Sequence, residues 1–198
     1  MSYEAYRILV ATFASEGKTS GTIQTADYIN YTKLNESRMH RLDKTMQVID
    51  EIKSYLENLN NEYIWLVLAE TWCGDAAQVI PVIHKMAELS AKIELRIVLR
   101  DNNEDLMNLF LTNGTKSIPK LIILDKKTGS VLADFGPRPF GATEFIKSYK
   151  AIHGIVDETA KIELQKWYLS DKGVGIQRDI AALMTTNQPQ TPQGKWRS

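Results

Sequence analysis

Hydrophobic residues recur at helical spacing in the segment from Arg38 to Leu59. This period is typical of an amphipathic helix with one buried face, so we predict a single helix over residues 38–59 that ends at "NLNN". We expect its apolar stripe to cover a sheet, and the alternative is a seam for a partner protein. The residues of the stripe are Met39, Leu42, Met46, Ile49, Ile52, Tyr55, Leu56 and Leu59.

Residues 1–37 have only weak periodicity and are rich in Thr, Ser, Asn and Tyr. We predict irregular structure here, with one short helix near residues 26–32. The apolar stretch "ILVATFA" has only seven residues, follows Glu4 and lacks a basic start, so it is a poor signal peptide.

After residue 60, short apolar runs alternate with helical patterns. The continuous run "YIWLVLA" (63–69) is typical of a strand buried on both faces, and "KLIILD" and "SVLADF" around "KKTG" predict an antiparallel hairpin. This order predicts an α/β fold in which a central mixed sheet is flanked by helices. The other expected elements are a strand at 92–99 and helices at 74–90, 103–112, 142–152, 157–169 and 176–184.

The same pattern divides the chain into four parts. Residues 1–60 form an N-terminal extension packed on the core, 61–153 the core, 154–186 a C-terminal helical extension, and 187–198 a polar tail expected to be disordered. We expect Trp167 and Tyr168 to hold the C-terminal helix on the body. If these two side chains were exposed instead, they would mark a docking surface.

Composition limits the functions that this chain can have. Its 198 residues include 24 basic and 24 acidic ones, so no global field attracts nucleic acid or an anionic membrane. No run approaches the roughly 20 apolar residues that span a bilayer. A single cysteine excludes an internal disulfide and is compatible with a reducing compartment, so we expect a cytoplasmic protein. The oligomeric state is not indicated.

The only cysteine lies in "WCGDA", directly after the predicted strand 63–69. Cys73 therefore begins a helix, where unpaired backbone N–H groups and the helix dipole lower a thiol pKa. The carboxylates of Glu70 and Asp75 oppose this effect. We expect a modest net lowering of the pKa of Cys73.

Two segments, "WCGDAAQVIP" and "SIPKLIIL", carry a resemblance. They are similar to the active-site turn and the Ile-Pro loop of the thioredoxin family, over roughly residues 55–150. The resemblance implies a thioredoxin-like fold, with Trp72 and Cys73 at the active site, Pro81 inside the following helix, and a cis Pro119 facing Cys73. More closely, "ETWCGDA" together with "WYLSDKG" resembles an uncharacterised bacterial branch of these proteins.

Three positions depart from the family pattern. Ala76 stands where the resolving cysteine would be, Val67 stands where the buried acid would be, and Asp75 replaces the proline between the two cysteines. The first two departures agree with each other, because an acid that serves the resolving thiol has no task without it. The sequence therefore excludes self-contained dithiol catalysis.

A lone thiolate can still attack a disulfide, although release then needs an outside thiol. We interpret the chain as a possible enzyme, a monothiol disulfide oxidoreductase or redox-responsive protein that acts on a protein or peptide disulfide or thiol. Its co-substrate would be a small thiol such as glutathione, without another cofactor or metal. Oxidation of the thiol to a sulfenic acid would instead make the site a sensor. The alternative is a non-catalytic thioredoxin-fold module that binds a peptide or protein.

The candidate site consists of Cys73 as the nucleophile and a set of residues that contact substrate. For Cys73 the alternative is a purely structural residue, for Trp72 a plain packing role, and for Pro119 a simple turn. Backbone groups of Ile118 are expected to meet a peptide, as the resemblance implies. The predicted substrate-binding residues are Trp72, Gly74, Asp75, Ile118 and Pro119.

Other polar residues have simpler interpretations. We expect Glu70 to be a solvated loop residue and Asp75 to favour the helix N-terminus, rather than the two forming an acid–base pair or a cation site. Lys120 and Arg138 could meet an anionic thiol, but isolated basic residues are usually only solvated.

The three histidines do not support a hydrolase. His84 lies 11 residues beyond Cys73 on the same predicted helix, about 16 Å away, which is too far for it to act as a base. His40 and His153 are expected at the surface or its boundary. One cysteine and three scattered histidines make no recognisable zinc-binding spacing.

Overall fold

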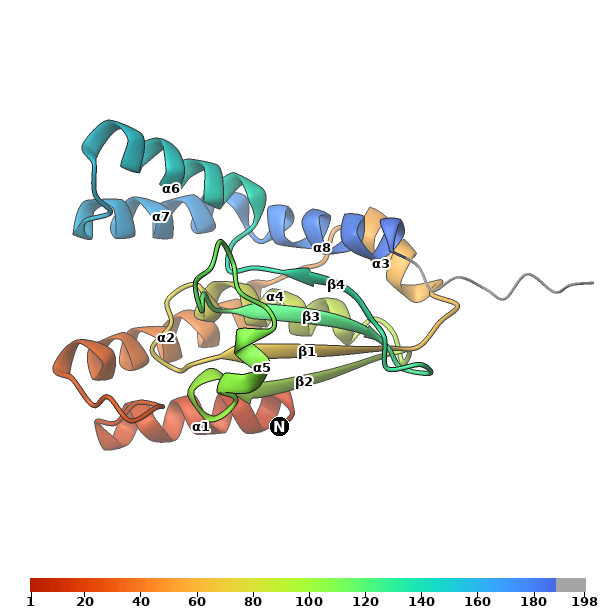
Figure 1. The fold of residues 1–198 in the computed structure, drawn as a ribbon, viewed down its shortest axis with the longest axis horizontal. Coiled ribbons are helices and arrows are strands. Elements are labelled where there is room, and N and C mark those ends of the chain that lie inside the picture. Colours follow the sequence, from red (N-terminus) through yellow and green to blue (C-terminus); the bar gives the residue numbers. More distant parts are fainter. Residues whose placement is uncertain (188–198) are drawn as a thin grey trace, which may run out of the picture.

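The computed structural model describes residues 1–187. They form a four-stranded sheet with helices packed around it (Figure 1). The strand order is β2-β1-β3-β4. Strands β1 and β2 run parallel, whereas β3 is antiparallel to both of its neighbours. The predicted mixed sheet with a hairpin is therefore present. The strands are β1 (Tyr63–Ala69), β2 (Ile93–Leu99), β3 (Lys120–Asp125) and β4 (Val131–Phe135).

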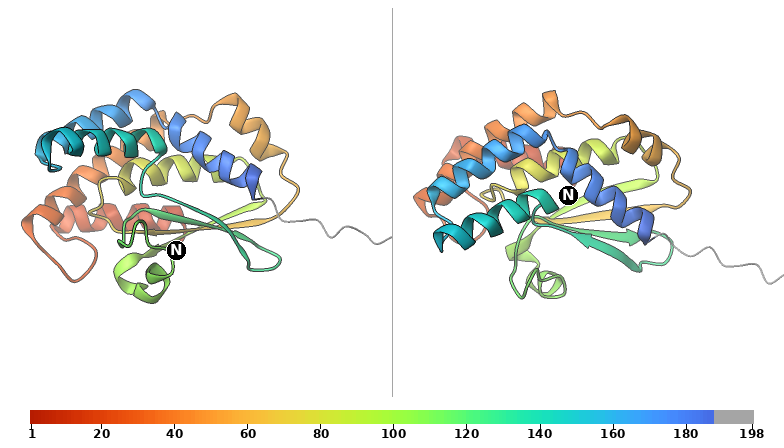
Figure 2. Two further views of the ribbon diagram at one scale, coloured as in Figure 1. Left: turned by 45° about the horizontal axis from the view of Figure 1, so that its top comes forward. Right: turned by 90° about the horizontal axis from the view of Figure 1, so that it is seen from above.

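Helices cover this sheet unequally. Helices α2, α4 and α8 lie over one face, while the short α5 projects from the opposite side (Figure 2). The segment predicted as a helix over residues 103–112 is helical only in α5. The helices are α1 (Tyr3–Glu16), α2 (Ala26–Thr45), α3 (Asp50–Glu57), α4 (Ala76–Ala87), the 3-10 turn η1 (Arg100–Asn102), α5 (Glu104–Asn108), α6 (Phe140–His153), α7 (Glu158–Asp171) and α8 (Val174–Thr186).

The prediction of irregular structure was wrong for residues 3–16, which form α1, whereas the short helix expected near residues 26–32 is present as the first part of α2. Helix α1 is capped by Ser2, whose Oγ accepts a hydrogen bond from the N–H of Ala5 at 3.2 Å, and it ends at Gly17, where φ is +66°. Tyr6 and Val10 are buried. Apolar residues such as Ile8, which is 68% exposed, also lie outside the buried stripe of this helix, so the periodicity was weak although both end signals were present.

The prediction of one helix over residues 38–59 was also wrong. The chain is helical up to Thr45, extended at Met46 and Ile49, and helical again from Asp50. The buried Gln177 of α8 accepts a hydrogen bond from the N–H of Ile49 at 2.9 Å and donates one to the carbonyl of Gln47 at 3.1 Å. A side chain far along the sequence therefore holds this break.

The N-terminus pairs with the edge of the sheet. The N–H of Ile97 in β2 donates to the carbonyl of Met1 at 2.9 Å, and the terminal ammonium of Met1 donates to the carbonyl of Ile97 at 2.8 Å. This contact covers part of an edge strand that would otherwise be open. Within residues 1–187, no helix has the length and apolar character needed to cross a bilayer.

Both extensions share one hydrophobic core with the sheet. Tyr6 of α1 and Ile180 of α8 belong to the same cluster as Trp65 of β1. Tyr168 is buried and Trp167 packs against this cluster, so the prediction that they hold the C-terminal helix on the body is confirmed. The tail predicted to be disordered lies beyond the described residues from position 188 onward.

Candidate functional site

Cys73 lies in the turn between β1 and α4, the position that the sequence predicted. Only 8% of its surface is exposed. Its backbone N–H donates to the carbonyl of Glu70 at 3.2 Å, and its Sγ donates to the carbonyl of Ile118 at 3.2 Å. The bond between Ile118 and Pro119 is cis, as the resemblance implied. The thiol thus contacts the loop that was expected to face it.

The expected lowering of the Cys73 pKa was wrong. Burial, followed by the negative charge of Asp75, raises the pKa of this thiol to about 12. The N–H groups of Ala76 and Asp75 and the guanidinium of Arg138 act in the opposite direction but are outweighed. The sequence indicates the helix N-terminus but not the burial of the thiol, and burial has the larger effect. Cys73 is a neutral thiol at pH 7.

Asp75 is held by two side chains rather than by the helix that it begins. Its Oδ2 pairs with Nη2 of Arg138 at 2.7 Å, and its Oδ1 accepts a hydrogen bond from the hydroxyl of Tyr168 at 3.0 Å. The side chain makes no capping hydrogen bond to α4. The expectation that Arg138 is only solvated was therefore wrong, because this guanidinium forms an ion pair with Asp75 beside the thiol.

Trp72 is fixed between two side chains. Its ring stacks on Tyr28 of α2, with centroids 4.5 Å apart and planes 7° from parallel, and the guanidinium of Arg100 lies 5.1 Å from its centroid. Stacked aromatic pairs and cation–π contacts both stabilise such an arrangement. Trp72 is therefore part of a rigid wall.

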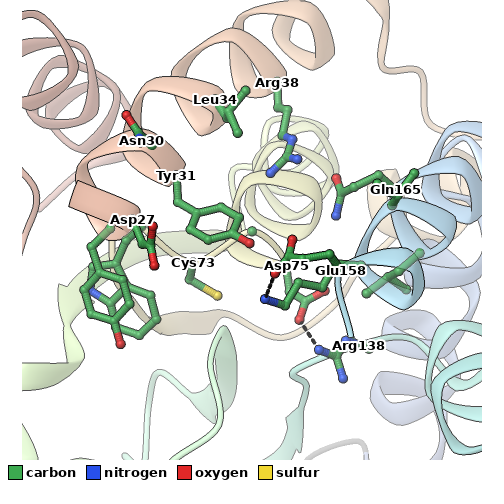
Figure 3. A pocket seen from close by; sticks show the side chains of 16 residues that line it. Asp27, Asn30, Tyr31, Leu34, Arg38, Cys73, Asp75, Arg138, Glu158 and Gln165 are labelled. Carbon is green, nitrogen blue, oxygen red and sulfur yellow. Dashed lines mark hydrogen bonds and ion pairs between the residues drawn. The ribbon is translucent and has the colours of Figure 1, made fainter. Parts of the chain in front are cut away.

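A cleft of about 570 Å³ opens beside Cys73 (Figure 3). One wall is α2, the opposite wall is α7, and the turn Trp72–Asp75 with Arg138 lies between them. Its volume is in the range of small-molecule sites, and its lining combines aromatic and aliphatic side chains with a similar number of charged and amide side chains. Both helical walls lie within segments that we predicted to be extensions of the core.

Arg38 brings a positive charge to this cleft (Figure 3). Its Nη1 donates to Oδ1 of Asn35 at 2.9 Å, and Nδ2 of Asn35 donates to the carbonyl of Thr71 at 2.8 Å. Within residues 1–187, no carboxylate lies within ion-pair distance of this guanidinium. Burial lowers the pKa of Arg38, which shows that the charge is partly withdrawn from water.

The predicted site residues fall into two groups. Trp72, Cys73, Gly74 and Asp75 line the cleft. Ile118 and Pro119 do not line it and are buried. The carbonyl of Ile118 already accepts the hydrogen bond of Cys73, so this loop closes the floor behind the thiol.

Glu70 is not the solvated loop residue that the sequence predicted. It is fully buried, accepts a hydrogen bond from the N–H of Asp101 at 2.8 Å, and accepts another from the hydroxyl of Ser20. Burial raises its pKa in spite of these two bonds. Glu70 therefore ties the N-terminal extension to the end of β1.

The remaining candidates lie away from the cleft. Lys120 is buried and pairs with Asp134 at 2.6 Å, so it neither meets a ligand in the cleft nor is solvated as expected. His84 stacks on Tyr3 with ring centroids 3.9 Å apart, and His40 and His153 are exposed. Within the described part of the chain, no three His, Cys, Asp or Glu residues are grouped as metal ligands would be.

Sequence reasoning missed the residues that the two walls contribute. Tyr31 and Arg38 come from α2, and Gln165 comes from α7, while Tyr168 was expected to hold α7 but not to contact Asp75. Tyr168 lies 93 positions from Asp75, the residue to which it donates. No local sequence pattern indicates these contacts, because they join residues of separate helices that only the tertiary fold brings together.

Comparisons with known proteins agree with this architecture. A family profile described as thioredoxin matches residues 21–150. No curated protein is significantly similar to the chain.

Two solved structures share the fold. The protein of unknown function PA1234 from Pseudomonas aeruginosa is 17% identical, with a TM-score of 0.61 over 94% of this chain and 99% of that one. An HIV epitope scaffold is 18% identical, with a TM-score of 0.58 over the same shares. At these identities the likeness shows the fold alone, and the predicted thioredoxin-like fold is confirmed.

Proposed function

The chain belongs to the thioredoxin family, and from this premise we propose that it is a binding protein rather than a catalyst. Its ligand, a small molecule or the end of a peptide, would occupy the cleft between α2 and α7. The observation that carries this proposal is the state of Cys73, which is buried, neutral and hydrogen-bonded to Ile118 beside a cleft of about 570 Å³. In this role the thiol is a structural donor.

The chemistry of the thiol supports this reading. A pKa near 12 leaves about one thiol in 10⁵ ionised at pH 7, which is about 3,000-fold less thiolate than an ordinary cysteine provides. The greater nucleophilicity of a more basic thiolate recovers only about 30- to 50-fold of this loss. Exchange should therefore be roughly 100-fold slower than for a free cysteine, before burial slows access further.

A neutral fluorescent probe tests binding in the cleft. Phenylnaphthylamine should become strongly fluorescent with the wild-type protein, because the walls are largely apolar. Leu34→Trp, which fills the cleft from α2, should abolish this signal. Leu109→Trp is the matched control, since Leu109 is 76% exposed and lies outside the cleft. Equal fluorescence with both variants would show that the probe binds elsewhere and would refute the proposal.

Monothiol exchange is the second candidate. The observation in its favour is that the N–H groups of Asp75 and Ala76 and the guanidinium of Arg138 all lower the pKa of Cys73. In that reaction the Cys73 thiolate attacks one sulfur of a disulfide and expels the other as a thiolate. A small thiol such as glutathione then attacks the mixed disulfide, forms a new disulfide with the substrate sulfur and releases Cys73 in its reduced form.

Glutathione disulfide distinguishes the two candidates. If the protein is a binding module, its glutathione adduct should form more slowly in the native state than in urea, as followed by intact mass. Faster adduct formation in the native state would favour monothiol exchange. The single cysteine also supports a reducing compartment such as the cytoplasm as part of the proposal.

A further inference from the structure

Arg38 has more hydrogen-bonding capacity than its surroundings use. The guanidinium carries five N–H donors, and within the described residues its one side-chain hydrogen bond goes to Asn35. It is also partly buried without a carboxylate partner in that range. A charge withdrawn from water without a partner is costly, so a bound anion would relieve this cost.

The guanidinium is also held in place before any ligand arrives. Arg38 is fixed by Asn35, and Asn35 is fixed to the carbonyl of Thr71, the residue before Trp72. Its orientation is therefore tied to the turn that carries Cys73. Preorganisation of this kind reduces the entropy that binding must overcome.

No carboxylate of the cleft forms an ion pair with Arg38 among the described residues, although the charge of Asp75 acts on it through space. Asp75 is held by Arg138 and Tyr168, and Glu158 pairs with Lys161 at the exposed rim. Asp27 lies 11 positions before Arg38 on α2, about 16 Å along the helix. An anion at Arg38 thus meets one unmatched positive charge and no unmatched negative one nearby.

Neighbouring groups complete an anion site. The side chain of Tyr31 points into the cleft, with its hydroxyl towards the centre (Figure 3). Gln165 uses its Oε1 to accept a hydrogen bond from Gln78 at 2.7 Å, which leaves its amide N–H groups to donate into the cleft. Leu34, Ile162 and the stacked ring of Trp72 offer apolar surface beside these donors.

We propose that the cleft binds an organic anion, a molecule with one negatively charged group on an apolar body. Arg38 contacts the charged group, with Tyr31 and Gln165 as further donors, and the apolar body lies against Leu34, Ile162 and Trp72. This inference rests on the proposed binding function and names the chemical class of its ligand.

Two probes with the same aromatic body test it. Anilinonaphthalene sulfonate carries a negative charge, whereas phenylnaphthylamine does not. Arg38→Met should weaken binding of the sulfonate about tenfold or more and leave binding of the neutral probe unchanged, because a charge-assisted contact is lost. Arg38→Lys should restore part of the affinity. Arg41→Met removes an exposed charge from the same helix and should change neither probe.

The outcomes separate this inference from the proposed function. If Arg38→Met leaves the affinity for the sulfonate unchanged while the neutral probe still binds in the cleft, the anion site is refuted and the binding function stands. If the wild-type protein binds neither probe, both proposals fall. Should Arg38→Met fail to fold, salt provides the same test on the wild-type protein. High salt must weaken the sulfonate and not the neutral probe, and equal effects on both would refute the anion site.

Discussion

The thiol of Cys73 donates a hydrogen bond to the carbonyl oxygen of Ile118, 3.2 Å away. This contact joins the two segments by which the sequence resembled the thioredoxin family. It also uses the backbone acceptor that the resemblance assigned to a bound peptide. The thiol of Cys73 and the carbonyl of Ile118 are therefore hydrogen-bonded to each other and not to a ligand. The surface that is open to a ligand lies instead in the cleft between α2 and α7.

The first prediction concerns the titration of Cys73. Because its pKa is raised to about 12, the rate of alkylation by iodoacetamide should rise about tenfold per pH unit from pH 7 to pH 10, without a plateau. In urea the same thiol, with a pKa near 9, should approach its plateau near pH 10. A plateau below pH 9 in the native protein would contradict the buried, neutral thiol.

The raised pKa also has a consequence for stability. The folded protein holds the Cys73 proton more tightly than the unfolded chain, so this stabilisation is complete below the unfolded pKa, near 9, and is lost as the pH rises towards 12. Cys73→Ser should therefore lose less stability than the wild type between these values. Urea unfolding of both proteins at a series of pH values measures the difference in their free energies of unfolding. Other titrating groups contribute equally to both proteins and therefore cancel in this difference.

The second prediction concerns Asp75 as the charge that opposes ionisation of Cys73. Asp75→Asn keeps the acceptor for Tyr168 but removes the negative charge, so Arg138 and the backbone N–H groups act on the thiol without opposition. The pKa of Cys73 should fall, and alkylation at pH 8 should become severalfold faster.

Glu158→Gln is the control for this variant. It removes a carboxylate at the exposed rim of the same cleft and should leave the alkylation rate unchanged. If Asp75→Asn also leaves the rate unchanged, Asp75 does not set the state of the thiol, and burial alone explains it.

The core of the fold could be predicted because its signals are local. The strand at 63–69 was predicted at its observed ends, since a continuous apolar run between polar residues has few other structures available. Helix α4 and the hairpin of β3 and β4 were equally visible. The cis bond at Pro119 could be expected only from the resemblance, because an isolated Ile-Pro pair does not indicate its isomer.

The site itself could be predicted only along its own turn. The residues of the turn were found, but the pKa of Cys73 was predicted in the wrong direction because burial is a tertiary property. Glu70 shows the same limitation. In the sequence, a glutamate after a strand is typical of a solvated loop residue. In the structure, Glu70 is buried and hydrogen-bonded to Ser20, which lies 50 positions earlier in the chain. Long-range packing decided the electrostatics in both cases.

The third prediction concerns Glu70 and pH. Burial raises its pKa, so the folded state binds this proton more tightly than the unfolded chain does. The resulting stabilisation is complete below the usual value of 4.5 and is lost as the pH rises through the folded pKa. Relative to the wild type, Glu70→Gln should therefore gain free energy of unfolding as the pH is raised from 4.5 to 8.

Urea midpoints at several pH values measure this trend. Glu57→Gln removes one negative charge from the exposed face of α3 and should show no such trend. If the difference in free energy of unfolding between Glu70→Gln and the wild type were the same at every pH, the pKa of Glu70 would not be raised by folding, and the prediction would be wrong.

The fourth prediction concerns Gln177, which holds the break between α2 and α3. Replacement by Leu preserves an apolar contact surface but leaves the N–H of Ile49 and the carbonyl of Gln47 without their partner. Both hydrogen bonds are only part-buried, so water can replace some of the lost pairing, and Gln177→Leu should lower the free energy of unfolding by about 1–2 kcal/mol. Urea unfolding measures this loss, and hydrogen exchange should show reduced protection of the Ile49 amide.

Arg178→Leu is the matched control, since it places the same side chain at the exposed neighbouring position of α8. It should change the free energy of unfolding by less than about 0.5 kcal/mol. Equal losses in the two variants would mean that the hydrogen bonds of Gln177 do not hold the break. The apolar residues from Met39 to Leu59 would then have to set it themselves, although their spacing favours an unbroken helix.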